Sequence, residues 1–231
     1  MYKPFRKYNM DSADKYAGIA SDIIDYVEKE IIPRYSRFDK AHRQDHVRMV
    51  IEQSLTLAAH EAGLDRNMVY VVAAFHDVGL VGGRENHHHE SRRILESDTF
   101  VRSHFGPEDI MVMGQAVEDH RASNSSRPRS LYGLIVAEAD RFIDVETIIR
   151  RTIQYGLANY PELDRDGHFQ RTVRHITEKY GPAGYLKIWI PWSSNAANLD
   201  RLRSLLADRV RMAEIFNRIF DEEISAEIQM S

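Results

Sequence analysis

The sequence of 231 residues contains no cysteine. Disulfide bonds, thiolate metal sites and cysteine nucleophiles are therefore excluded. Histidine and the carboxylates are the strong metal ligands that remain, so any metal ion in this protein would be held by nitrogen and oxygen atoms.

Long apolar runs and a charge excess are missing as well. No stretch approaches the about 18 continuous apolar residues of a membrane helix, so no membrane association is expected. The amino terminus, MYKPFRKYNM, has no apolar core or small-residue cleavage site, and a cytoplasmic location is the expectation. The formal net charge of -4 argues against general nucleic-acid binding, although a local basic patch could bind a small anion.

Apolar residues recur at helical spacing along most of the chain, whereas alternating strands, internal repeats and low-complexity linkers are not evident. Residues 68–75 are continuously apolar, and their valines are compatible with a buried strand. Asp65 as an N-cap and the pair Ala73 and Ala74 favour a central helix instead. The fold class is therefore predicted to be all-α, with helices over residues 19–31, 47–58, 68–75, from 90 onward, 107–120, 131–154, 164–180 and 195–220.

The stretch FHDVGL, residues 75–80, places His76 and Asp77 at the end of that apolar run. Burying two ionisable side chains without partners costs on the order of several kcal/mol. A salt-bridge network, a pair of satisfied hydrogen bonds or a metal ion must compensate for this cost. The pattern by itself leaves all three open.

Other ionisable residues fall on or beside the apolar faces of neighbouring helices. His42 and His46 are four residues apart and share one helix face. His120 ends the helix over 107–120, and Asp140 is flanked by apolar residues in the next helix. A single histidine on an apolar face is usually a core residue with a satisfied hydrogen bond. Four helices that each carry such an ionisable residue indicate a common site.

The order of His46, the adjacent pair His76 and Asp77, and then Asp140 resembles the HD-domain metal-dependent phosphohydrolase superfamily. The resemblance extends over about residues 39–144 and includes the context HDVGL after an apolar run and EADR around Asp140. It implies that His46, His76, Asp77 and Asp140 hold a metal ion.

The resemblance also implies the domain organisation. Residues 1–231 would form a single HD-type helical domain. Its metal-binding core would cover about residues 39–144, and a helical extension would cover about residues 150–231.

Two imidazoles and two carboxylates suit a divalent transition metal (Mn, Fe, Co, Ni or Zn), with open positions for water and substrate. An ion of this kind lowers the pKa of its water toward neutrality, which generates a hydroxide able to attack phosphorus. The alternative is a buried salt-bridge set without a metal. That arrangement needs a buried cation, and Arg141 beside Asp140 is the nearest basic residue in the sequence.

Members of the superfamily that bind two ions have additional histidines between the His-Asp pair and the last aspartate. In this chain, ENHHHESRRIL and EDHR lie in that interval. One or two ions are therefore expected, and the candidates for a second ion or for phosphate binding are His87, His88, His89 and His120. A solvated loop with incidental metal affinity is the alternative for the three consecutive histidines.

Arg121 follows His120 and precedes a loop that also contains Arg127 and Arg129. Positive charge at this place suits an anionic substrate, whereas an ordinary helix end with basic residues is the alternative. The resulting prediction is that Asp77, His120 and Arg121 are catalytic and that His42, His87, His88 and Arg121 bind substrate.

The predicted function is hydrolysis of a phosphoester or phosphoanhydride in a small metabolite, with a nucleotide as the leading substrate class. Some nucleotidases of the superfamily have a glutamate shortly after the His-Asp pair, but Val78, Gly79 and Leu80 follow it here, so no proton-transfer group is assigned. The alternatives are a di-iron oxygenase of the same superfamily and a non-catalytic sensor that binds a nucleotide or a metal. The expected partner is a small phosphorylated substrate, and the choice between a monomer and a homodimer stays open.

Overall fold

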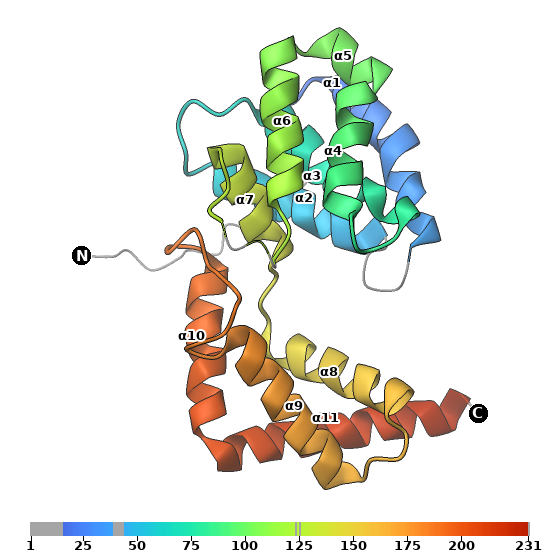
Figure 1. Ribbon diagram of the computed structural model, residues 1–231, viewed down its shortest axis with the longest axis vertical. Coiled ribbons are helices and arrows are strands. Elements are labelled where there is room, and N and C mark those ends of the chain that lie inside the picture. Colours follow the sequence, from blue (N-terminus) through green and yellow to red (C-terminus); the bar gives the residue numbers. More distant parts are fainter. Residues whose placement is uncertain (1–15, 39–43, 123, 125, 231) are drawn as a thin grey trace. The chain divides into compact units, whose positions relative to one another are not determined.

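The structure, a computed structural model, describes residues 16–38, 44–122, 124 and 126–230. The regular elements in these residues are all helices, which confirms the all-α prediction. Contacts divide the chain into two compact units, with a boundary between Arg141 and Phe142 (Figure 1). The organisation into one domain, with a core over about 39–144 and an extension over about 150–231, stays a prediction.

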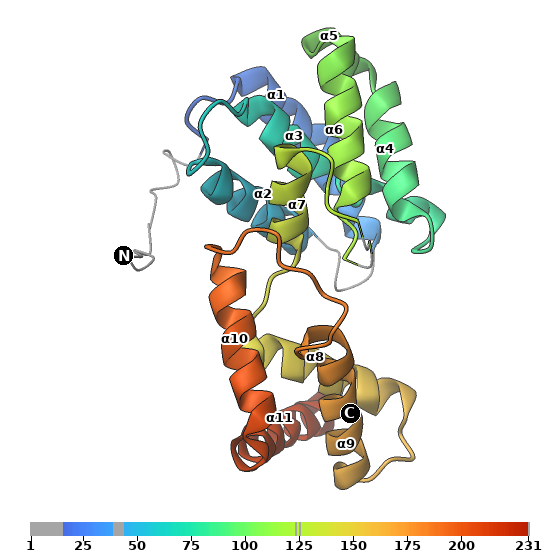
Figure 2. The ribbon, with the colours of Figure 1, turned by 60° about the vertical axis from the view of Figure 1, so that its left-hand side comes forward.

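The first unit packs its helices around α3. α3 contacts α2, α4, α6 and α7, and α4 also packs against α6 (Figures 1 and 2). The helices that carry the predicted site residues therefore converge on one central element. The elements are α1 (Ser21–Tyr26), the π-helix η1 (Val27–Ile31), the 3-10 helix η2 (Ile32–Arg37), α2 (Gln44–Ala58), α3 (Arg66–Phe75), the 3-10 helix η4 (Val78–Gly82), α4 (His87–Ser97), α5 (Thr99–His104), α6 (Pro107–Asp119) and α7 (Leu131–Asp140).

α3 is a helix and not a strand, which confirms the prediction for residues 68–75. The side chain of Asp65 caps it by accepting a hydrogen bond from the backbone N–H of Asn67 at 2.7 Å. Every residue from 68 to 75 is buried, as expected of a helix that other helices surround. His76 and Asp77 follow directly and are themselves buried, with exposed fractions of 0% and 4%.

Tyr35 and Gly79 hold the turn that follows α3. The buried hydroxyl of Tyr35 donates to the carbonyl of Ala74 at 2.8 Å and accepts from the backbone N–H of Asp77 at 3.2 Å. Gly79 lies against the backbone of α4, and a Cβ on Gly79 would come within 2.2 Å of the carbonyl oxygen of His87. The absence of a side chain at Gly79 therefore lets α4 approach the His-Asp pair closely.

Several helix boundaries in the first unit differ from the prediction, two of them with consequences for the site or the chain path. α4 begins at His87 and not at residue 90, so the three consecutive histidines form the first turn of a helix and not a solvated loop. Pro33 does not end the helical run over residues 19–31, because η2 begins one residue before it. A proline in the first turn of a helix lacks an N–H that would have no intrahelical partner there.

Two predicted helices are each divided into two. The helix expected over 131–154 is interrupted because α7 ends at Asp140 and α8 (Val145–Asn159) begins after Asp144. Asp144 stops the continuous pattern by capping α8: its side chain accepts from the backbone N–H of Thr147 at 2.8 Å. The helix expected over 195–220 is likewise divided at Asp208.

The second unit is formed by α8 and three further helices. α8 packs against α9 (Arg165–Tyr180) and α11 (Arg209–Met230), and α10 (Ser194–Ala207) also contacts α9 and α11 (Figure 2). The buried core of this unit includes Ile149, Ile153, Leu202, Phe216 and Ile219. In the described parts of both units, no helix has an apolar stretch long enough to cross a membrane.

Gly79→Ala tests the close approach of η4 to α4. The added methyl group would overlap backbone atoms of His87 and Ser91, which cannot rotate away, so we expect the free energy of unfolding to fall by about 1–3 kcal/mol. Gly82→Ala is the matched control, because its Cβ would lie 3.9 Å from its nearest neighbour, Glu90. Urea unfolding followed by circular dichroism measures both variants, and equal stability of the two would contradict the close approach.

Candidate metal centre

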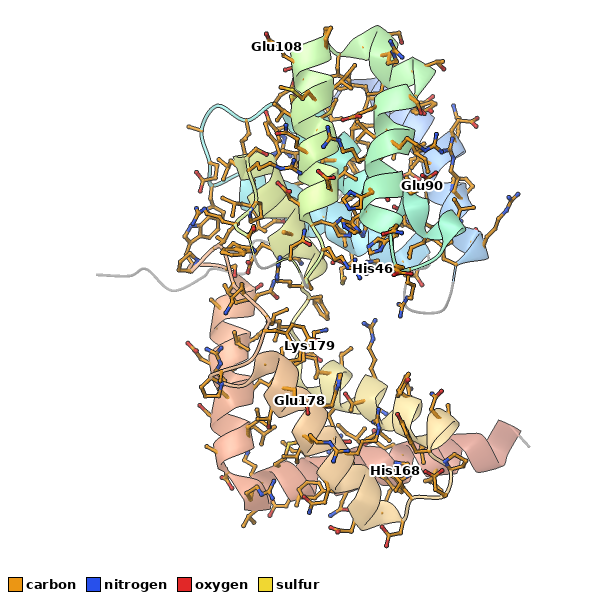
Figure 3. All side chains as sticks on the ribbon, in the orientation of Figure 1. His46, Glu90, Glu108, His168, Glu178 and Lys179 are labelled. Carbon is orange, nitrogen blue, oxygen red and sulfur yellow. The ribbon has the colours of Figure 1, made fainter. Side chains whose placement is uncertain are left out.

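Four residues from three helical segments meet at the end of α3 and form what we call the first ligand set: His46, His76, Asp77 and Asp140. Nε2 of His46 on α2 lies 3.3 Å from Nε2 of His76 and 3.2 Å from Oδ1 of Asp140 on α7. Oδ2 of Asp77 lies 3.3 Å from Nε2 of His76. Figure 3 labels His46 at this place. The structure thus brings together the four residues that the sequence order predicts as metal ligands, and their role stays a prediction.

A second ligand set consists of Asp77, His87 and His120. It uses the other oxygen of the Asp77 carboxylate. Oδ1 of Asp77 lies 3.4 Å from Nε2 of His87, at the start of α4, and 3.3 Å from Nε2 of His120, after α6. The two histidine Nε2 atoms are 3.3 Å apart. In each set, three donor atoms lie within 4.8 Å of one another and could hold one metal ion. Asp77 is therefore shared between two candidate ion sites.

Backbone carbonyls determine which ring nitrogen of each histidine faces Asp77. Nδ1 of His76 lies 2.8 Å from the carbonyl oxygen of Ala73. Nδ1 of His87 and of His120 contact the carbonyls three residues earlier in the same way, at 2.8 and 2.6 Å. Because a carbonyl oxygen can only accept, each Nδ1 carries a proton, and Nε2 of each ring faces the cluster. Two Nε2 atoms that face each other at 3.3 Å need a proton or a metal ion between them, so these atoms are placed where they could bind a metal ion.

The electrostatics of these residues also favour bound positive charge. Burial lowers the pKa of His76, but Asp77 and Asp140 raise it more, to about 9. Burial raises the pKa of Asp77, yet the neighbouring histidines, His76 foremost, hold it well below its usual value. The pKa of Asp140 is lowered by His46 and His76 against the same effect of burial. Both carboxylates are therefore ionised at neutral pH and available as ligands.

Arg141 does not supply the cation that a salt-bridge set without a metal would need. Its side chain is buried, but Nη1 of the guanidinium donates to the carbonyl of Ala137 in α7. Among the described residues, the ion-pair partners of the Asp140 carboxylate are His46 and His76. A metal-free salt-bridge set would therefore have to rely on a protonated His76, which lies 3.3 Å from Asp77.

A cavity of about 270 Å³ lies beside the two ligand sets. Nη1 of Arg121 donates to the carbonyl of Glu85 at 2.8 Å, which holds its guanidinium next to the loop before α4. Arg84 also lies on the cavity wall, although the sequence-based prediction did not include it. The sequence signal that could have indicated Arg84 is its position as a basic residue in the glycine-rich stretch after the His-Asp pair. The wall consists of Asp77, Leu80, Arg84, His87, His120, Arg121, Ala122 and Asp140.

An ion cluster joins α4 to α6 next to the second ligand set. Glu118 on α6 accepts hydrogen bonds from Nδ1 of His89 at 2.7 Å and from Nη1 of Arg92 at 2.9 Å, both on α4. Arg129, in the loop after α6, donates to Glu118 and to Asp119. Burial raises the pKa of Glu118, but its hydrogen bonds with Arg129, Arg92 and His89 lower it to about 2. The ionised carboxylate therefore holds together the helix ends from which the second ligand set projects.

Two described residues named in the prediction, His88 and Arg129, do not line the cavity. His42 lies outside the described residues. His88 is buried, its ring centre is 4.0 Å from that of His89, and it does not contribute to the cavity wall. Arg129 is bound by Asp119 and Glu118, so its charge is directed away from a substrate. The substrate-binding roles of His42 and His88 stay predictions, and the geometry gives His88 no support.

Comparison with known proteins agrees with this geometry. Residues 43–143 match the family model described as HD domain. No curated protein and no solved structure shows significant similarity to the chain. The matched segment includes the four residues of the first ligand set and the two additional histidines of the second. Residues 43–143 are therefore similar to the HD domain family, which confirms the resemblance that the order of the histidines and aspartates predicts.

Proposed function

We propose that the HD domain is a metal-dependent phosphohydrolase that cleaves a phosphoester or phosphoanhydride bond in a small metabolite. The observation that carries the proposal is the Asp77 carboxylate, whose two oxygens face different histidine pairs beside a cavity with arginines on its wall. This arrangement combines places for two divalent ions with positive charge for an anionic substrate.

The ligand chemistry defines which residues would hold which ion. His46, His76, Asp77 and Asp140 would hold one ion, and Asp77, His87 and His120 would hold another. Mixed imidazole and carboxylate ligands suit Mn, Fe, Co, Ni or Zn. Such ions would supply Lewis acidity at the phosphoryl oxygens and a water of lowered pKa as the nucleophile.

The protein's own contribution is to orient the phosphoryl group. The planar guanidinium of Arg121 can donate two parallel hydrogen bonds to phosphate oxygens, and its bond to the Glu85 carbonyl limits its motion. The cavity volume of about 270 Å³ is slightly below the range of about 300–1,000 Å³ for typical ligand sites, which favours a compact substrate. A nucleotide remains within the proposal if its phosphate part occupies this cavity.

A di-iron oxygenase is the second candidate function, because the same two ligand sets suit a pair of iron ions. The arginines on the cavity wall favour phosphate chemistry over this alternative. Phosphate release from a panel of phosphorylated metabolites, measured with Mn-, Co- and Fe(II)-loaded protein, tests the proposal. Oxygen consumption with Fe(II) and no phosphate release would replace it with the oxygenase, and inactivity in both assays would favour a sensor.

Asp77→Ala and His87→Ala should differ in metal content. We expect about two ions per chain in the unchanged protein, about none in Asp77→Ala and about one in His87→Ala, because only Asp77 is common to both ligand sets. Elemental analysis of protein purified without a histidine tag, together with circular dichroism, gives the measurement. His89→Ala is the control from the same run of histidines, since His89 binds Glu118 and should leave both ions in place. Equal metal content in all three variants would remove the basis of the assignment.

Arg121→Ala should separate substrate binding from metal binding. We expect unchanged metal content and a kcat/KM lowered on the order of 10²-fold, as for the loss of one preorganised charged contact. Arg121→Lys should restore part of the activity, because an ammonium replaces the charge but not the planar fork. Steady-state kinetics and metal counts on the same preparations provide the comparison. Wild-type kinetics for Arg121→Ala would mean that this arginine only completes the end of α6.

A further inference from the structure

The cavity wall contains a second arginine that the proposed reaction does not yet use. Arg84 lies in the loop between η4 and α4 and lines the cavity together with Arg121. The backbone of this loop is held by two side chains of the cavity wall. The carbonyl of Arg84 accepts from Nδ1 of His87 at 2.8 Å, and the carbonyl of Glu85 accepts from Arg121 at 2.8 Å. The position of Arg84 is thus tied to the second ligand set and to the other cavity arginine.

Positive charge on the cavity wall comes from these two residues. Arg92, Arg93 and Arg129 lie on or near α4 and α6, but none of them is among the residues of the cavity wall. The side chain of Arg84 is exposed, so it can reach a ligand without a change in the packing of the core. Arg84 and Arg121 therefore form a pair of cations at the opening of a buried metal centre.

The charges of the loaded site indicate what such a pair would bind. On the described part of the cavity wall, the negative charges of the two carboxylates are balanced by the positive charges of the two guanidinium groups. Divalent ions in both ligand sets would leave an excess of about four positive charges. A phosphate monoester brings about two negative charges, so it would leave much of this excess uncompensated. A substrate with a second anionic group beside the reacting phosphoryl group would compensate it better.

We propose that Arg84 forms a second anion-binding subsite beside Arg121, and that the substrate carries a second phosphate next to the phosphoryl group at the metal centre. The simplest ligand of this class is a compact diphosphate. This inference rests on the proposed phosphohydrolase function, since the first phosphoryl group is assigned to the metal centre. Arg121 contacts the phosphoryl group at the metal centre, and Arg84 contacts the second phosphate.

Calorimetric titration with two non-hydrolysable ligands tests the subsite. Methylphosphonate represents the single phosphoryl group, and methylenediphosphonate represents the diphosphate. Both are titrated into the full-length protein at one fixed concentration of Mn, with blank titrations that correct for ion binding by the ligand. Arg93→Ala is the matched control, because it removes one arginine charge from α4, where Arg93 binds Glu90 outside the cavity.

We expect Arg84→Ala to weaken binding of methylenediphosphonate by about tenfold, as for the loss of one charged hydrogen bond, while methylphosphonate binding and metal content stay unchanged. Arg93→Ala should leave both ligands at wild-type affinity. Three results would overturn the inference: an unchanged ratio of the two affinities in Arg84→Ala, an equal weakening of the binding of both ligands, or loss of a metal ion.

If the metal-loaded wild-type protein bound neither ligand, the proposed function itself would fail. Wild-type binding of methylphosphonate with no effect of Arg84→Ala would refute the subsite alone.

Discussion

The rest of the structure depends on one carboxylate that is shared between two pairs of imidazoles. Asp77 directs Oδ2 toward His76 and Oδ1 toward His87 and His120. A nearly buried carboxylate is costly unless positive charge, on His76 or on a metal ion, lies beside it. The backbone contacts of the Nδ1 atoms direct the Nε2 lone pairs toward this point. The fold therefore has to bring four helices to the end of α3 and hold them there.

Three sets of local contacts keep the candidate ligands close to Asp77. The hydroxyl of Tyr35 binds the backbone on both sides of His76, so the residue before Asp77 cannot turn away from the cluster. Gly79 lets η4 lie directly against the backbone of α4. Glu118 joins α4 to α6 through ionised hydrogen bonds. None of these residues belongs to a ligand set, but each limits how far the candidate ligands can move apart. Preorganised ligands bind ions and substrate at a smaller entropic cost.

The chemistry of the cavity follows from what surrounds this centre. The backbone of the loop that carries Arg84 accepts hydrogen bonds from the side chains of Arg121 and His87. Metal ligands and substrate-binding charges are thus parts of one connected structure and not separate features. A change in the loop before α4 would alter the second ligand set and the anion subsite together. If the proposed function holds, this coupling places the determinants of substrate specificity in the loop before α4.

The sequence by itself determined the fold class, the helical nature of residues 68–75 and the order of His46, His76, Asp77 and Asp140, because these depend on periodicity, capping and residue chemistry within short segments. It did not reveal the breaks at Asp144 and Asp208, since single capping residues interrupt otherwise continuous apolar patterns. Only the tertiary structure decided that His120 joins His87 at Asp77, that His88 does not line the cavity and that Arg84 does. These outcomes depend on how helices far apart in the sequence pack, and local spacing contains no information about the distances that packing sets between them.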